Sequence, residues 1–156
     1  MDRYLFVGLG SNLGNRRSYL TRASERFSEV LNLIESSTIH ETTPQGIETD
    51  RDFLNQVVHL EADPSGNSET DILEILMDLE GEIGRDRTGS SPDRVIDLDF
   101  LYWGDRVHET NPQLPHPRIE DRLFVLRPMV EIAPDFVHPL KGETQRELLR
   151  SLEKEQ

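Results

Sequence analysis

The sequence predicts a single α/β domain, because short apolar strands alternate along the chain with amphipathic helices. With 156 residues, of which 35% are hydrophobic, the chain is long enough for one compact domain with one core. Neither an internal repeat, nor a low-complexity tract, nor a flexible linker interrupts it. We therefore expect one domain that spans residues 1–156.

The first half of the chain contains three predicted strands and one helix. An apolar run at residues 4–9 predicts a buried strand, and the glycine-rich segment after it is expected to turn the chain into a helix at 15–34. The glycine spacing matches neither a Rossmann fingerprint nor a P-loop. Further strands are predicted at 36–42 and 53–62.

The second half begins with a capped helix. Ser68 followed by Asp71 has the spacing of a capping box, and the helix is expected to run to Ile83 and stop at Gly84. The remaining predicted elements are a strand at 94–101, a short strand around Val107, a helix over 119–127 that ends at Pro128, and an amphipathic helix from Thr144.

Composition excludes several classes of protein. The chain has no cysteine, which rules out disulfides, thiolate catalysis and cysteine-ligated zinc. No apolar run reaches 18 residues and no secretory signal is visible, so we expect a cytoplasmic protein that does not bind membranes. The formal net charge of -13 argues against nucleic-acid binding, so any anion must bind at a local cluster of cations.

Two aspartates in the predicted strand at 94–101 are the candidate catalytic residues and metal ligands. Asp97 and Asp99 lie on one face of a strand, whereas Ile96 and Leu98 lie on the other. Their Cα atoms would be roughly 6.5 to 7 Å apart, close enough for both carboxylates to hold one hard cation or to share two. The alternative is a solvated strand face without function.

Arginines precede these carboxylates in a segment rich in turn-forming residues. Arg85 and Arg87 lie in the predicted loop at 84–93, and Arg94 follows it. Guanidinium groups match phosphate oxygens, so arginines on a loop that leads into a carboxylate pair predict a site for a metal-bound polyphosphate. Taken singly, each arginine is more simply explained as part of a surface ion pair.

Phe53 and Asn55 share one face of the predicted strand at 53–62. An aromatic ring beside a side-chain amide is suited to hold a flat heterocycle, which stacks on the ring and hydrogen-bonds to the amide. A core phenylalanine next to an exposed asparagine is the alternative interpretation.

Two prolines hold His116 in a stiff segment, outside any helix. The nearby Arg118 and Arg122 favour the interpretation that this histidine faces the same anion, although a lone histidine is more often structural or merely exposed. Phe124 follows in the next predicted helix and is available to face a pocket.

Several short motifs occur in the order found in one enzyme family. They are Gly-Ser-Asn-Leu-Gly at 10–14, Thr42 to Gly46, Phe53-Leu54-Asn55, Gly84-Arg85, Arg94-Val-Ile-Asp97-Leu-Asp99, Pro115-His116-Pro117-Arg118, and Arg122-Leu-Phe124-Val-Leu-x-Pro128. Together they make the chain, from residue 4 to about 140, resemble the 6-hydroxymethyl-7,8-dihydropterin pyrophosphokinase family.

The resemblance implies a ferredoxin-like α+β sandwich, with a mainly antiparallel central sheet and helices on both faces. It also implies an enzyme of folate biosynthesis that transfers the β,γ-pyrophosphoryl group of ATP to the hydroxymethyl oxygen of a reduced pterin and releases AMP. Its partners would be ATP and 6-hydroxymethyl-7,8-dihydropterin. A monomer is expected, with a dimer as the alternative.

By the same resemblance, Asp97 and Asp99 would hold two Mg²⁺ ions that bridge the triphosphate oxygens, and Phe53 and Phe124 would sandwich the pterin. The residues implied to bind the rest of the pterin are Thr42, Thr43, Gln45 and Asn55. Those implied to contact the phosphates are Arg85, Arg94, His116, Arg118 and Arg122, and Arg87 would sit on the loop that closes over the site.

The chain departs from the family pattern at the end of this loop. Many members have an aromatic residue followed by Gly-Pro-Arg, whereas this chain has Ser91-Pro92-Asp93-Arg94. Closure of the loop is therefore expected to differ, and Asp93 is expected to add negative charge close to the triphosphate. Two alternative functions are a pterin-binding module without catalysis, suggested by the altered loop, and a metal-dependent nucleotide hydrolase in which water replaces the pterin hydroxyl.

Overall fold

The computed structural model describes residues 3–45, 47–86, 88 and 91–155. The elements in chain order are β1 (Tyr4–Ser11), α1 (Arg16–Val30), β2 (Asn32–Ser36), β3 (His40–Thr42), β4 (Phe53–Glu61), α2 (Glu69–Ile83), β5 (Asp97–Trp103), the 3₁₀ helix η1 (Ile119–Asp121), α3 (Leu123–Ile132) and α4 (Gln145–Glu155). Strands and helices are thus interspersed along the chain, as the sequence predicts.

The central sheet has the strand order β2-β4-β1-β5, and β3 pairs with the end of β4. The pairs β1–β4, β1–β5, β2–β4 and β3–β4 are all antiparallel. The succession β1-α1-β2-β4-α2-β5 is the βαββαβ order of a ferredoxin-like fold. The predicted α+β sandwich with an antiparallel sheet is confirmed.

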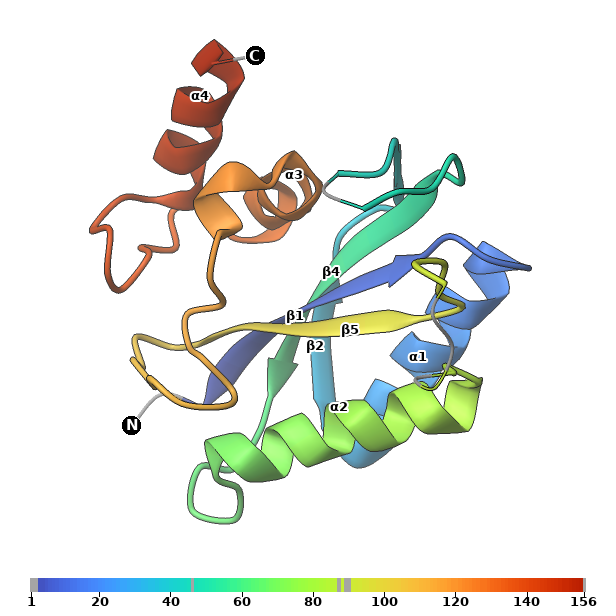
Figure 1. Cartoon of the computed structure of the whole chain (residues 1–156). Helices are drawn as coiled ribbons and strands as arrows, with labels where there is room; N and C mark the ends of the chain where they lie inside the picture. The colour runs from blue at the N-terminus through green and yellow to red at the C-terminus, as the bar shows by residue number, and fades with distance from the viewer. Residues whose placement is uncertain (1–2, 46, 87, 89–90, 156) are drawn as a thin grey trace.

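Helices cover both faces of the sheet (Figure 1). Alternate side chains of β1 divide between two cores, since Leu5 and Val7 pack with α1 and α2 whereas Phe6 packs with α3 and α4. In Figure 1, α2 lies along one face, and α3 and α4 lie beyond the opposite face. The second core ends before β1 does, which leaves one end of that face open for a site.

The capping signals of α2 are confirmed in detail. Ser68 Oγ accepts a hydrogen bond from Asp71 N at 3.1 Å, and Asp71 Oδ2 accepts one from Ser68 N at 2.8 Å. The helix ends at Gly84, whose backbone φ of 124° is a value that residues other than glycine rarely adopt. This end is the one that faces β5.

The predicted helix at 15–34 is too long, because α1 ends at Val30 and residues 32–36 form β2. Its expected apolar stripe also breaks there, since Val30 and Ile34 are 40% and 45% exposed. Pairing with β4 supplies backbone hydrogen bonds that outweigh the weak helical pattern. The predicted strand at 36–42 is accordingly split into the end of β2 and the short β3.

Two predictions near the C-terminus are wrong as well. The helix expected to end at Pro128 is a 3₁₀ turn followed by α3, which continues through Pro128 to Ile132. Proline costs one backbone hydrogen bond there, and the burial of Val125 and Met129 compensates for it. The strand expected around Val107 is reduced to one isolated bridge between His108 and Leu114.

Within the described part of the chain, no helix is both long and apolar enough to cross a bilayer.

Candidate active site

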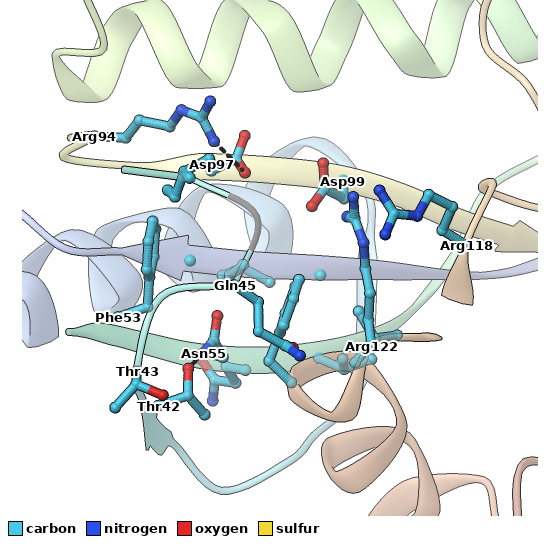
Figure 2. Close-up of a pocket in the computed structure, with 18 of the residues that line it drawn as sticks. Thr42, Thr43, Gln45, Phe53, Asn55, Arg94, Asp97, Asp99, Arg118 and Arg122 are labelled. Atoms are coloured by element: carbon cyan, nitrogen blue, oxygen red, sulfur yellow. Dashed lines mark hydrogen bonds and ion pairs between the residues drawn. The ribbon is translucent and has the colours of Figure 1, made fainter. Parts of the chain in front are cut away.

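A cavity of about 340 Å³ lies on the face of the sheet that carries α3, at the open ends of β4, β1 and β5. Its size is at the lower end of the range for small-ligand sites. The close-up in Figure 2 shows residues from all three strands around it. Its wall is formed by Gly8, Leu9, Gly10, Thr42, Thr43, Gln45, Ile47, Phe53, Asn55, Gln56, Val57, Arg94, Asp97, Asp99, Arg118, Asp121, Arg122, Phe124 and Val125.

Two glycines of β1 form the floor of the cavity. β1 is longer than predicted and runs to Ser11, so Gly10 as well as Gly8 lies inside the strand. Gly10 pairs with Asn55 on one side and with Asp97 on the other. A Cβ on Gly10 would lie 3.4 Å from Asn55 Oδ1, so the missing side chain leaves the floor free for a ligand.

Asp97 and Asp99 project from β5 toward the cavity, on the same face, as the alternation predicts. The alternate residues Ile96 and Leu98 are buried in the opposite core. Burial raises the pKa of Asp99 to about 7, and the nearby charge of Asp97 adds to the rise. Two charged carboxylates side by side are therefore unfavourable in this buried place.

Asp97 is the better compensated of the two aspartates. Arg85 Nη1 donates to its Oδ1 at 2.7 Å, and Arg94 Nη1 donates to its Oδ2 at 3.4 Å. Arg85 also donates to Glu80 at 2.8 Å, and Glu80 accepts from the backbone N–H of Leu98 at 2.7 Å. Glu80 thus lies beside the arginine segment, and Arg85 lies behind Asp97 rather than in the cavity wall.

The opposite wall of the cavity carries the residues predicted to hold a flat heterocycle. Phe53 and Asn55 lie beside each other on β4, and Thr42, Thr43 and Gln45 approach from the end of β3 and the loop after it (Figure 2). Asn55 is only 6% exposed, and its Nδ2 donates to Thr42 Oγ1 at 2.6 Å. This bond fixes which way the amide faces.

Phe124, at the start of α3, completes this side of the cavity, and its ring lies 5.5 Å from the guanidinium carbon of Arg122. Figure 2 shows the side chains of Arg118 and Arg122 reaching toward Asp99. Arg118 has a φ of 71°, a strained value for a residue with a Cβ, and such values concentrate at functional sites.

His116 reaches the site through its Nε2 atom, which lies 3.9 Å from Asp99 Oδ1. Its other ring nitrogen, Nδ1, lies 2.8 Å from the carbonyl oxygen of Pro117, an arrangement that orients the ring. Burial lowers the pKa of His116, so the neutral imidazole is the favoured form at pH 7.

The structure thus gathers most of the predicted site residues around one cavity. Arg87 lies outside the described residues. Sequence reasoning missed the floor, although glycines at alternate positions of an apolar strand were the signal for it. Asp121, Gln56 and Val57 also line the cavity without having been predicted, and no sequence signal set them apart.

The two carboxylates fit a magnesium site whose remaining ligands come from a substrate. Mg²⁺ commonly takes one or two carboxylates and fills its octahedron with water and phosphate oxygens. Among the described residues, no group of three acidic, histidine or cysteine side chains could hold a metal alone. Burial and the neighbouring charge of Asp97 raise the pKa of Asp99, a strain that a bound cation would relieve, and Arg94, Arg118 and Arg122 line the same cavity.

An antiparallel α+β sheet with a heterocycle-sized cavity, a carboxylate pair and converging arginines defines an enzyme of the phosphoryl-transfer class. Residues 6–134 match the sequence profile of the 7,8-dihydro-6-hydroxymethylpterin-pyrophosphokinase (HPPK) family. The chain belongs to this family.

Bacterial relatives are similar over nearly their whole length. The 2-amino-4-hydroxy-6-hydroxymethyldihydropteridine pyrophosphokinase of Methylorubrum extorquens is 37% identical over 152 residues, which cover 95% of this chain and 92% of the relative. The protein of the same name from Aquifex aeolicus is 36% identical over 144 residues, which cover 92% and 88%.

Solved structures share the fold at low identity. The Plasmodium falciparum HPPK-DHPS structure with pteroate superposes with a TM-score of 0.74 at 14% identity, over 100% of this chain and 46% of that one. An HPPK-DHPS complex with substrates gives a TM-score of 0.73 at 15% identity, over 99% of this chain and 44% of that one. This chain therefore spans less than half of those longer chains.

Proposed function

We propose that this chain is an ATP-dependent pyrophosphokinase of folate biosynthesis. It transfers the pyrophosphoryl group of ATP to the hydroxymethyl group of 6-hydroxymethyl-7,8-dihydropterin and yields the pterin diphosphate and AMP. The observation that carries this proposal is the pairing of Gly10 with Asn55 on one side and Asp97 on the other, which puts a heterocycle wall opposite a carboxylate pair. Membership of the pyrophosphokinase family supports it.

The reaction is a single displacement at phosphorus. The hydroxymethyl oxygen forms a bond to the β-phosphorus, the bond from that phosphorus to the oxygen that bridges it to the α-phosphorus breaks, and AMP leaves with the electron pair. The hydroxyl proton is lost to solvent. The protein forms no covalent intermediate in this scheme, so its contribution is to position two substrates and to stabilise charge.

Asp97 and Asp99 would hold the magnesium, with two ions expected between them and the triphosphate. The metal would neutralise phosphate charge and align the β-phosphorus with the attacking oxygen. The burial of Asp99 beside the charge of Asp97 supports this assignment, because two neighbouring carboxylates are costly to ionise without a cation.

The cationic side chains would hold the triphosphate. We assign Arg85 and Arg94 to catalysis, with Arg85 acting on Asp97 and Arg94 lining the cavity beside Asp97. His116, Arg118 and Arg122 would bind phosphate oxygens from the far end of the carboxylate pair. Arg87 is also assigned to phosphate binding, only because the sequence of the chain resembles the family at this position.

The pterin would stack between Phe53 and Phe124, which come from β4 and α3. Asn55, held by Thr42, would hydrogen-bond to the edge of the ring, and the segment at Thr43 and Gln45 would close over it. The reduced ring would then present its hydroxymethyl group across the glycine floor.

The first test is AMP formation from ATP and MgCl₂, with and without 6-hydroxymethyl-7,8-dihydropterin, resolved by anion-exchange chromatography. Pterin-dependent AMP together with a diphosphorylated pterin is the expected result. AMP formed equally without pterin would instead indicate a nucleotide hydrolase. Pterin binding without any AMP would indicate a non-catalytic module.

We also propose that residues 1–156 form one catalytic domain that works as a monomer in the cytoplasm. The absence of cysteine supports a reducing compartment. Sedimentation equilibrium at micromolar concentration tests the monomer, and a mass of twice 18.0 kDa would reject it.

A further inference from the structure

The carboxylate of Asp93 joins two loops that border the cavity. Asp93 lies in the segment 84–96, between α2 and β5. Its Oδ1 accepts a hydrogen bond from Thr49 Oγ1 at 2.6 Å, and its Oδ2 lies 3.1 Å from Arg51 Nε. Thr49 and Arg51 belong to the loop 43–52, between β3 and β4.

A third contact ties both loops to the end of β1. Asn12, which is 3% exposed, donates from Nδ2 to Asp93 Oδ1 at 2.9 Å. Its Oδ1 accepts from Arg94 N at 2.7 Å, and its own N–H donates to Arg94 O at 3.0 Å. Asn12 therefore holds the backbone of Arg94 and the side chain of Asp93 at once.

The two joined loops serve opposite ends of the site. The loop 43–52 contributes Thr43, Gln45 and Ile47 to the heterocycle wall. The segment 84–96 contributes Arg94, the residue directly after Asp93, to the side that carries the carboxylates. Asp93 is thus adjacent in sequence to Arg94 on the phosphate side, and its carboxylate forms an ion pair with Arg51 of the loop on the heterocycle side.

The negative charge of Asp93 is balanced by Arg51 where the two loops meet. Its side chain is 18% exposed, and Arg51 and two uncharged donors surround the carboxylate. Asp93 forms no part of the cavity wall in the described structure. The expectation that it brings negative charge to the triphosphate therefore finds no support in the geometry, which turns the carboxylate toward Arg51.

We propose that Asp93 is a positioning residue that couples the pterin-side loop to the phosphate-side segment, so that binding of one substrate favours binding of the other. The coupling rests on the proposed function, because it assumes a heterocycle at one end and a nucleotide at the other. Two sites linked by a shared ordered element have a mutual coupling free energy, and the coupling is reciprocal.

Substitutions on either side of one ion pair test this coupling. Asp93→Asn and Arg51→Ala each remove the pair yet leave acceptors for Asn12 and Thr49. Calorimetry would give the affinity for 6-hydroxymethyl-7,8-dihydropterin and for a non-hydrolysable ATP analogue with MgCl₂, each alone and with the other bound. We expect each variant to reduce the mutual enhancement by about fivefold or more. The double variant should be no worse than either single one.

The decisive measurement is nucleotide affinity in Arg51→Ala with pterin bound, since Arg51 lies on the opposite loop and lines no part of the described cavity. An affinity equal to that of the wild type would overturn the proposal, as would additive effects in the double variant. Arg146→Ala, which breaks an exposed pair with Asp135 at 2.6 Å, is the matched control and should change neither affinity. Wild-type chain that binds neither ligand would overturn the proposed function itself, which separates the two failures.

Discussion

Arg85 and Asp97 meet behind the cavity wall, where Arg85 Nη1 donates to Asp97 Oδ1 at 2.7 Å. The same nitrogen donates to Glu80 at 2.8 Å, and the Glu80 side chain is 4% exposed. A single guanidinium therefore supports a proposed metal ligand and a buried carboxylate together. This arrangement links the end of α2 to the start of β5.

Arg85→Ala should lower the free energy of unfolding by about 2 to 4 kcal/mol, because it removes a cation from beside a buried carboxylate. Urea denaturation at pH 7 measures the change. Arg26→Ala provides the control, since its pairs with Glu82 and Glu29 are at the surface and should contribute little. A loss no greater than that of the control would contradict the structural role of Arg85.

Asp99→Asn should make the metal-free protein more stable at neutral pH. The pKa of Asp99 is raised to about 7 in the folded state, chiefly by burial, so between pH 4 and 7 the folded state binds the proton more tightly than the unfolded state. The free energy of unfolding of the wild type should therefore fall as pH rises through this range. Asp99→Asn should remove that fall and gain about 1 to 3 kcal/mol at pH 8.

Urea unfolding of both proteins at pH 4 and pH 8, in EDTA, measures this difference. At pH 4 the two should be nearly equally stable. Added MgCl₂ should stabilise wild type at pH 8 and leave Asp99→Asn unaffected. Equal pH dependence in the two proteins would show that Asp99 is well compensated without metal.

Asn55→Ala should raise the KM for the pterin about tenfold or more and change the KM for ATP by less than twofold. The amide is buried and held in one orientation by Thr42, so its loss would leave pterin groups without partners. Steady-state kinetics with each substrate varied in turn distinguish the two effects. Thr42→Val, which removes the hydroxyl that accepts from the amide, should give a smaller change in the same direction.

Gly10→Ala should weaken pterin binding about tenfold without unfolding the protein. Its Cβ would lie 3.4 Å from Asn55 Oδ1 and 3.6 Å from Phe53 Cδ1, contacts that the fold tolerates but that narrow the space for a ring. Fluorescence titration with the pterin measures the loss. Unchanged affinity would mean that the ring does not sit over the floor.

Gly81→Ala is the control for Gly10→Ala, because it makes the same glycine-to-alanine change away from the cavity. Gly81 lies within α2, and a Cβ there meets nothing within 4 Å. Alanine should therefore stabilise the protein by about 0.5 to 1 kcal/mol through its helix propensity and leave turnover unchanged. Thermal unfolding and the AMP assay check the two parts, and a loss of stability would reveal a packing role for this glycine.

Local signals were sufficient for much of the fold. The capping box at Ser68 and the glycine at position 84 fixed both ends of α2, because the interactions that cap a helix involve residues close in sequence. The alternation at Asp97 and Asp99 likewise predicted which face of β5 carries the carboxylates. The sequence predicts helix for residues 32–34, which are strand in the structure, because their pairing with β4 depends on residues more than twenty positions away.

The candidate site could be predicted residue by residue but not as an arrangement. Nothing local indicates that Gly10 separates Asn55 from Asp97, since this depends on which strands are neighbours in the sheet. The partners of Asp93 were also hidden, because Asn12 and Thr49 lie 81 and 44 positions away in the chain. An isolated aspartate beside an arginine was therefore misread as a charge facing the phosphates.

The glycine floor also sets a length. Adjacent strands in a sheet are about 4.8 Å apart, so β4 and β5, separated by β1 alone, are about 9.5 Å apart whatever their side chains. The distance between the backbone of the heterocycle wall and that of the carboxylate strand would then be fixed by main-chain hydrogen bonds, and side-chain substitutions could alter affinity without altering this spacing. This spacing is a property of the fold itself, which this chain shares with the Plasmodium falciparum HPPK-DHPS structure at only 14% identity.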